Sequence, residues 1–197
     1  HFPEILAFFR SIYPLVELDI QKPDLGESIE LNSDYDLFFY MGAARYSGDY
    51  VTRPLTTYEL AAFMSERNPL FWQKHVTLRE LARQEFILPG LSTLREIIRG
   101  YCYQEGFIPN IIGEASHPGG QKLLLDTQAE RRVALALRGV DAPWGEGYKL
   151  MPITGPSYGV DVNAAWSQSP PLRPSAEAFR DFVLHYYSEG AQGILLE

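Results

Sequence analysis

The chain has 197 residues, of which 46% are apolar and 21% are charged, as is usual for a protein with a hydrophobic core. Its 17 Lys and Arg residues against 25 Asp and Glu residues give a formal net charge of −8, and the cations are not clustered. Because nucleic-acid binding needs clustered cations that displace counterions from phosphates, we expect this chain to make no DNA contact of its own. The single cysteine, Cys102, excludes an intrachain disulfide and favours a reducing, cytoplasmic setting. No apolar run approaches the roughly 20 residues that span a bilayer, so we expect no membrane partner.

The first part of the chain predicts one helix followed by strands. Residues 3–12 place apolar side chains at helical spacing, and Tyr13-Pro14 ends this helix because a residue before proline is pushed out of the α region. Residues 16–20 alternate apolar and acidic side chains, which predicts a strand. A short helix is expected near residues 25–31, and the apolar run at 36–41 is typical of a strand buried on both faces.

The rest of the chain alternates strands with helices. The expected strands cover residues 58–64, 86–88, 110–114, 133–137, 148–153 and 160–166. The expected helices cover residues 77–83, 89–105, 120–127 and 175–187. Thr77 and Glu80 have the spacing of a capping box, Gly106 closes the second of these helices, and Ser175 is expected to cap the last. This alternation predicts an α/β fold with a parallel or mixed sheet.

The order of the elements suggests two lobes. Residues 58–167 form a self-contained α/β run, and the helix that follows has no partner strand beside it, so we expect it to pack back on the first block. Lobe I would then comprise residues 1–57 and 168–197, and lobe II residues 58–167. Two crossover strands would join them, with a cleft in which a small ligand binds.

Together these segments resemble the effector-binding domain of LysR-type transcriptional regulators. The opening FPEILAFFRSIYPLVELDIQ resembles the family's first helix and strand, DYDLFFYMG a following strand, and VNAAWSQSPPLRPSAEAFRDFVLHYY the return strand, proline-rich turn and terminal helix. The run RPLTTYELAAFMSERNPLFWQKHVTLRELARQEFILPGLSTLREIIRGYCYQEGFIPNI covers the stretch from the crossover strand to the long helix. The resemblance implies a periplasmic-binding-protein-like (type 2) fold, in which each lobe is a mixed sheet flanked by helices.

The chain departs from the family pattern in two places. The first strand of lobe I and the winged helix-turn-helix DNA-binding domain are missing from it, so any DNA contact of the regulator would come from that N-terminal domain. Residues 128–138 lack the family's glycine-rich turn, which puts a ligand contact from this turn in doubt.

The segment Leu91-Ser92-Thr93 is the first candidate for ligand contact. It follows a strand and opens a helix, where backbone N–H groups and hydroxyls favour an anion such as a carboxylate. The alternative is that Ser92 and Thr93 only cap the helix, with Thr93 and Glu96 as a second capping box. The resemblance favours the ligand role, because this loop lines the family's effector cleft.

Further candidates lie on three loops that the resemblance places around the same cleft. They are Gln21, Lys22 and Pro23, then Met41 and Gly42, and finally Ser116 and His117. Lys22 would pair with an acidic effector, although a loop lysine is usually only solvated. His117 would hydrogen-bond a ligand or be satisfied within the protein, and Met41 would line the pocket or pack in the core.

Enzyme-like patterns in the chain do not meet the requirements of their chemistry. Gly155-Pro-Ser157-Tyr-Gly159 has the letters of a nucleophile elbow, but the next residues predict a strand rather than a helix, so we interpret it as a hairpin turn. Cys102 lies mid-helix among apolar residues and is expected in the core. The four histidines lack metal-ligand spacing, and no glycine-rich phosphate loop is present, so we expect no metal, no cofactor and no enzyme.

The sequence therefore predicts the effector-sensing domain of a LysR-type regulator, which binds a small metabolite, possibly a carboxylate, and changes conformation. A homodimer is implied by the resemblance, through the helices at Phe2–Ile12 and Thr93–Glu105. The alternative is a solute-binding receptor of a transport system with the same fold, which would need a signal peptide that the opening residues do not display.

Overall fold

The computed structural model describes residues 2–21, 35–43, 49–139 and 145–188. The chain divides into two compact units. It passes from the first to the second between Thr56 and Thr57, and it returns between Asp161 and Val162. Unit 1 holds residues 1–56 and 162–197, and unit 2 holds residues 57–161. Residues 162–167, expected in the second block, lie with unit 1 because they pair with its first strand.

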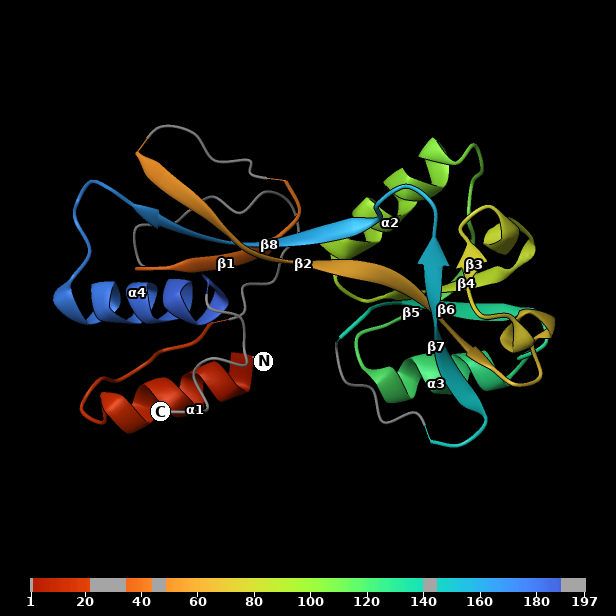
Figure 1. Ribbon diagram of the computed structural model, residues 1–197, viewed down its shortest axis with the longest axis horizontal. Helices are drawn as coiled ribbons and strands as arrows, with labels where there is room; N and C mark the ends of the chain where they lie inside the picture. Colours follow the sequence, from red (N-terminus) through yellow and green to blue (C-terminus); the bar gives the residue numbers. More distant parts are fainter. Residues whose placement is uncertain (1, 22–34, 44–48, 140–144, 189–197) are drawn as a thin grey trace. The chain divides into compact units, whose positions relative to one another are not determined.

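The described residues of unit 1 form two helices and a small group of strands (Figure 1). They are α1 (Phe2–Ile12), β1 (Phe38–Met41), the first part of β2 (Tyr50–Ser65), the end of β8 (Gly159–Ser167) and α4 (Pro174–Ser188). β1 pairs antiparallel with β8, with Phe38 opposite Ala165 and Met41 opposite Val162.

The core of unit 1 joins the two ends of the chain. Ile5 and Phe9 of α1 pack against Phe179, Val183 and Tyr186 of α4, and all five side chains are buried. The rings of Phe9 and Phe179 meet edge to face, with centroids 4.8 Å apart. The prediction that the last helix packs back on the first block is therefore confirmed.

Three sequence predictions in unit 1 are wrong. Residues 16–20 form no strand in the described structure, since strand pairing needs a neighbour that an alternating pattern alone does not supply. β1 is an edge strand that pairs only with β8 in the described structure, so its side chains are mostly half-buried rather than buried on both faces. α4 begins at Pro174, so Ser175 lies inside the helix and is not its cap. The helix expected near residues 25–31 lies outside the described residues.

Unit 2 contains a mixed sheet. Its elements are the second part of β2, η1 (Pro69–Trp72), β3 (Val76–Thr77), η2 (Glu80–Arg83), β4 (Glu85–Pro89), α2 (Ser92–Gln104), β5 (Asn110–Ala115), α3 (Pro118–Asp126), β6 (Arg132–Leu137), β7 (Tyr148–Thr154) and the start of β8. β4 is parallel to β5 and β6, whereas β2 is antiparallel to β6 and β7. α3 packs on β4, β5 and β6, while α2 packs on β4 from the other side of the strands (Figure 1).

Most strands and helices of unit 2 follow the predictions, because their signals are local. The helix expected at residues 77–83 is the exception: Val76–Thr77 is the short strand β3, and only Glu80–Arg83 is helical, as the 3-10 helix η2. Thr77 and Glu80 form the expected capping box: the Thr77 N–H donates to Glu80 Oε2 at 2.7 Å, and the Glu80 N–H donates to Thr77 Oγ1 at 3.2 Å. Gly106 follows α2 with φ +83°, a left-handed conformation suited to glycine. β2 is longer than predicted. Its first half was not predicted as a strand because it contains Pro54 among polar residues and lacks an apolar pattern.

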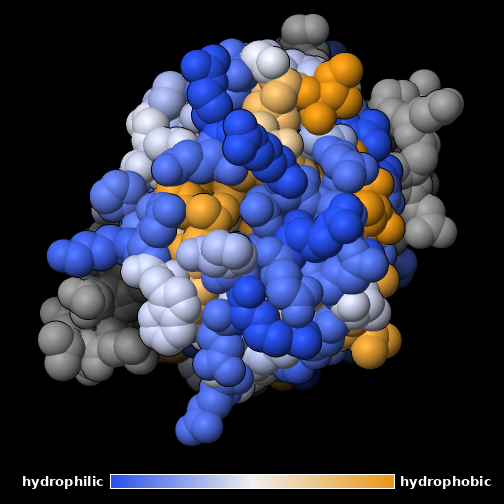
Figure 2. Space-filling model, turned by 90° about the vertical axis from the view of Figure 1, so that its right-hand side faces the viewer, coloured by the Kyte–Doolittle hydropathy of each residue, from blue (hydrophilic) through white to orange (hydrophobic). Residues whose placement is uncertain are grey.

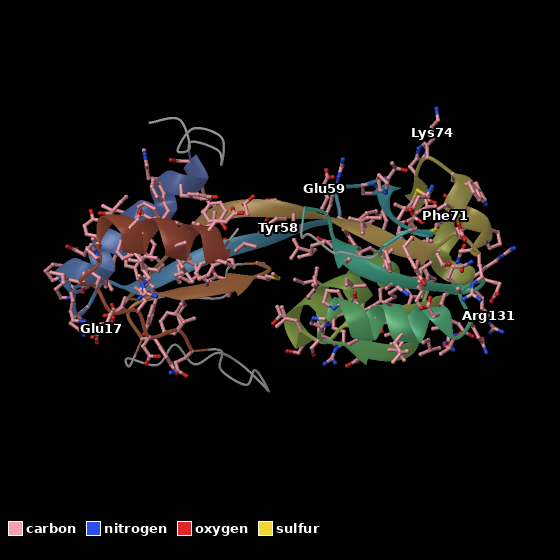
Figure 3. All side chains as sticks on the ribbon, turned by 90° about the horizontal axis from the view of Figure 1, so that it is seen from below. Glu17, Tyr58, Glu59, Phe71, Lys74 and Arg131 are labelled. Atoms are coloured by element: carbon pink, nitrogen blue, oxygen red, sulfur yellow. The ribbon has the colours of Figure 1, made fainter. Side chains whose placement is uncertain are left out.

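The face of unit 2 that is drawn in Figure 2 is mainly polar. Figure 2 shows hydrophobic side chains on this face only in small patches between hydrophilic ones. Lys74 points away from the fold (Figure 3), whereas Lys149 lies over the ring of Phe71, with its Nζ 4.5 Å from the centroid. Among the described residues, no helix is both long enough and apolar enough to cross a membrane.

Candidate functional site

The candidate site of unit 2 lies where β4 and β5 end side by side. The Gly90 N–H donates to the carbonyl of Ala115 at 3.0 Å, which joins the residues after β4 to the end of β5. A Cβ on Gly90 would lie 2.1 Å from Ser116 Oγ, so any larger residue here requires Ser116 to shift. Parallel strands end at the same edge of a sheet, and each of these is followed by a helix. The edge therefore carries the N-termini of both α2 and α3.

α2 begins with Ser92 and Thr93, after the N-cap residue Leu91. Leu91 has no polar side chain, and no side-chain hydrogen bond caps the helix. The prediction that Ser92 and Thr93 act as caps is therefore wrong, because the helix has already begun when they are reached. The first backbone bond of α2 runs from the Arg95 N–H to the Leu91 carbonyl at 3.0 Å. The N–H groups that precede it have no acceptor within the helix and form the positive end of its dipole.

Ser116 and His117 lie at the same edge, after β5. His117 is the N-cap of α3, and its Nδ1 accepts the Gly119 N–H at 3.0 Å. The bond requires Nδ1 to be unprotonated and leaves Nε2 of this exposed side chain to face solvent or a ligand. His117 thus has a structural role, in agreement with the alternative that its hydrogen bond is made within the protein. The structure brings Leu91, Ser92 and Thr93 into the neighbourhood of Ser116 and His117.

Two charged residues at this edge, Arg95 and Glu114, were not among the predicted site residues. Arg95 of α2 forms an ion pair through Nη1 with Glu114 of β5; the Arg95 side chain is partly buried and that of Glu114 is exposed. Arg95 Nε is buried and has no hydrogen-bond partner in the described structure. Glu114 and Arg95 are 19 positions apart and meet only in the folded unit, so no pattern of nearby residues could have predicted the pair. The pair cancels the carboxylate charge of Glu114 beside an edge that otherwise favours anions.

The remaining candidates belong to unit 1. Met41 ends β1 and is half-buried, and Gly42 follows it with φ +94°. The buried Asn163 of β8 donates from Nδ2 to the Gly42 carbonyl at 2.8 Å and so fixes this turn. Gln21 is exposed, and its Nε2 donates to Asp19 Oδ1 at 2.8 Å. Lys22 and Pro23 lie outside the described residues.

The enzyme-like patterns of the sequence, Gly155–Gly159 and Cys102, have no catalytic geometry in the structure. Gly155–Gly159 leads into β8, so it is not the strand-to-helix turn of a nucleophile elbow. The hairpin prediction is also wrong, because β7 pairs with β2 and β3, whereas β8 pairs with β1 and β2. Cys102 is fully buried, and burial raises the pKa of its thiol to about 12, which confirms a core position. No group of three or more His, Cys, Asp or Glu side chains among the described residues could hold a metal ion.

Comparisons with known proteins agree with this architecture. The family model described as the LysR substrate binding domain matches residues 1–188. The chain is 28% identical over 191 residues to the transcriptional dual regulator GltC of Bacillus subtilis (strain 168). That match covers 95% of this chain and 63% of GltC, so the chain spans less than two thirds of the length of this relative.

Two solved structures show the likeness of fold. HinK, a LysR family transcriptional regulator from Pseudomonas aeruginosa, has a TM-score of 0.76 at 22% identity, over 95% of this chain and 66% of HinK. The effector binding domain of QuiR in complex with shikimate has a TM-score of 0.72 at 20% identity, over 95% of this chain and 90% of that domain. They confirm the predicted α/β fold of the periplasmic-binding-protein-like (type 2) class.

Proposed function

The chain belongs to the LysR substrate binding domain family, and on this premise we propose that it is the effector-sensing domain of a transcription regulator. The whole regulator would contact DNA through an N-terminal domain outside this chain and would act in the cytoplasm. A ligand shifts such a protein only through its differential affinity for two conformations, which the DNA-binding domain would report. Membership of a family of regulators favours this function over a transport receptor of the same fold.

We propose that the effector is a small carboxylate held at the β4–β5 edge. The observation that carries this proposal is the N-terminus of α2, which follows the apolar Leu91 and lies beside Ser116. A carboxylate there would accept the N–H groups of Thr93 and Leu94 and the hydroxyls of Ser92 and Thr93. The effector binding domain of QuiR is in complex with shikimate, a small carboxylate, which supports this ligand class.

The experiment is thermal unfolding of the chain against a panel of small carboxylates and their neutral amides. A ligand at 100 times its dissociation constant adds about 2.7 kcal/mol, which is a rise of roughly 5 to 10 °C for a chain of this size. We expect carboxylates to raise the midpoint, their amides to do so less, and the double variant Ser92→Ala/Thr93→Ala to lose the rise. Ser175→Ala, at an exposed position of α4, is the matched control. A rise that persists in the double variant would place the ligand elsewhere.

We infer that the chain binds its small molecule without transforming it. The Cys102 thiol is held protonated in the core, and Ser157 lies on a turn between strands, so neither is arranged as a nucleophile. Product formation from any ligand of the panel, followed by mass spectrometry, would contradict this inference.

We propose a homodimer through α1 and the helix at Thr93–Glu105, which the family resemblance implies. Phe8 is 36% exposed and Ile12 50% exposed on α1, and Tyr103 is 56% exposed on α2. Phe9 is fully buried against Phe179, so a charge at Phe9 would unfold unit 1 rather than test the interface. We expect Ile12→Glu to lower the dimer fraction in sedimentation at micromolar concentration. Leu123→Glu, on α3, is the control, and an unchanged dimer in Ile12→Glu would exclude this interface.

A further inference from the structure

The last two turns of α2 are bonded to the residues that open β8. The Tyr101 hydroxyl donates to the Gly159 carbonyl, and the Tyr158 hydroxyl donates to Glu105 Oε1 at 2.8 Å. The rings of Tyr101 and Tyr158 also meet edge to face, with centroids 5.3 Å apart. We call Tyr101, Glu105, Tyr158 and the Gly159 carbonyl the α2–β8 cluster.

The cluster lies two residues from the point where β8 leaves unit 2. The chain passes between the units only at Thr56–Thr57 in β2 and at Asp161–Val162 in β8. These two strands are tied at that point, because Thr57 Oγ1 donates to Asp161 Oδ1 at 2.7 Å. A Cβ on Gly159 would lie 2.7 Å from Thr57 Cγ2, so the close approach of the strands requires glycine. Figure 3 shows Tyr58 and Glu59 on β2 immediately beyond this point.

The hydrogen bonds of the cluster are partly shielded from water. The Tyr158 side chain is only 6% exposed, and Tyr101 is half-buried. Burial and the bond to Glu105 raise the pKa of Tyr158 to about 12, so its hydroxyl stays a donor at neutral pH. A buried hydroxyl that donates to a carboxylate is costly to break, since both groups would be left without a partner.

We propose that the α2–β8 cluster fixes the direction in which β8 leaves unit 2 and thereby restricts how far the two connecting strands can bend. α2 carries the proposed carboxylate edge at its N-terminus and the cluster near its C-terminus, so a displacement of this helix would be transmitted to the two connecting strands. Only this last step rests on the proposed function. Tyr101, Glu105 and Tyr158 are positioning residues, because they act on β8 and do not touch the ligand.

The test measures the distance between the two units without any ligand. Spin labels are attached at Ser175→Cys on α4 and Leu123→Cys on α3, two exposed positions, while the buried Cys102 stays unlabelled. Distance distributions from double electron–electron resonance are compared for Tyr158→Phe, Glu105→Ala and Glu105→Gln in the labelled chain. Tyr35→Phe is the control, because this exposed tyrosine lies outside the proposed dimer helices and its hydroxyl has no hydrogen bond in the described structure.

We expect the distribution to shift or broaden in Tyr158→Phe and in Glu105→Ala. It should stay as in the parent in Tyr35→Phe and be restored in Glu105→Gln, whose amide oxygen still accepts the Tyr158 hydroxyl. Thermal unfolding of each variant separates this effect from a loss of stability. A lower midpoint with an unchanged distribution would overturn the proposal, because the cluster would then only stabilise unit 2. Since Tyr158→Phe and Glu105→Ala remove the same bond from its two ends, one of them suffices if the other fails to fold.

Discussion

Gly90 is a residue whose type is dictated by a neighbour far away in sequence. A Cβ there would meet Ser116 Oγ at 2.1 Å and Ser116 Cα at 3.0 Å, so Gly90→Ala requires the Ser116 side chain to rotate and its backbone to shift slightly. We expect this variant to lose about 1–3 kcal/mol of stability, measured by urea unfolding. Gly100→Ala is the control: nothing lies within 4 Å of its Cβ, so alanine within α2 should gain about 0.5–1 kcal/mol. Equal stability of Gly90→Ala and the parent would mean that the loops do not touch in solution.

Glu85 is a residue whose charge contributes to stability. Its carboxylate accepts Arg132 Nε at 3.0 Å and pairs with Arg131, and the bond to Arg132 is the main cause of a lowered pKa of Glu85. Because the folded pKa lies below that of the unfolded chain, this stability is present above the ordinary carboxyl pKa and is lost as the pH falls through the folded value. We expect Glu85→Gln to cost about 1.5–3 kcal/mol at pH 7 and progressively less below pH 4.5, the ordinary value.

Melting curves of Glu85→Gln and the parent between pH 7 and pH 3 check this. Glu59→Gln is the control, because Glu59 pairs with Arg138 at an exposed position and should matter little at any pH. A constant difference between Glu85→Gln and the parent over the whole range would show that packing, not charge, explains the loss.

At the scale of the element, the sequence predicted what local signals determine. The Thr77–Glu80 capping box and the helix closed by Gly106 depend on residues three or four positions apart, and both were correct. Pairing between distant segments was not predictable in this way. β7 and β8 follow one another but pair with other strands, and the Arg95–Glu114 pair of the candidate site forms only once α2 has folded back on β5.

The segment at residues 16–20 also shows that a local pattern does not determine strand pairing. It alternates as a strand does, and Val16 and Leu18 pack on the unit 1 core, yet Leu15 is 95% and Ile20 59% exposed. The apolar positions of the pattern therefore identify side chains that pack on the core, Val16 and Leu18, whereas strand formation needs a neighbouring strand that the pattern alone does not supply.

At the scale of the whole molecule, the two units differ in how the chain builds them. Unit 2 is one continuous stretch, Thr57–Asp161, with its own core around Phe63, Ile87, Leu125 and Ala134. Its two ends meet, since Thr57 Oγ1 and Asp161 Oδ1 are 2.7 Å apart. The core of unit 1 instead needs α1 and α4 from opposite ends of the chain. Folding of unit 1 therefore requires the closure of a long loop, which unit 2 spans.

We expect a fragment of residues 57–161 to fold alone and a fragment of residues 1–56 to stay unfolded. The first keeps all the neighbours of its buried strands β4 and β6, whereas the second exposes Ile5 and Phe9, which lose Phe179 and Val183. Circular dichroism and the cooperativity of thermal unfolding measure both outcomes. Mixing the 1–56 fragment with a peptide of residues 162–188 should restore helicity, because the two segments share one core. An unfolded 57–161 fragment would show instead that the two units depend on each other for stability.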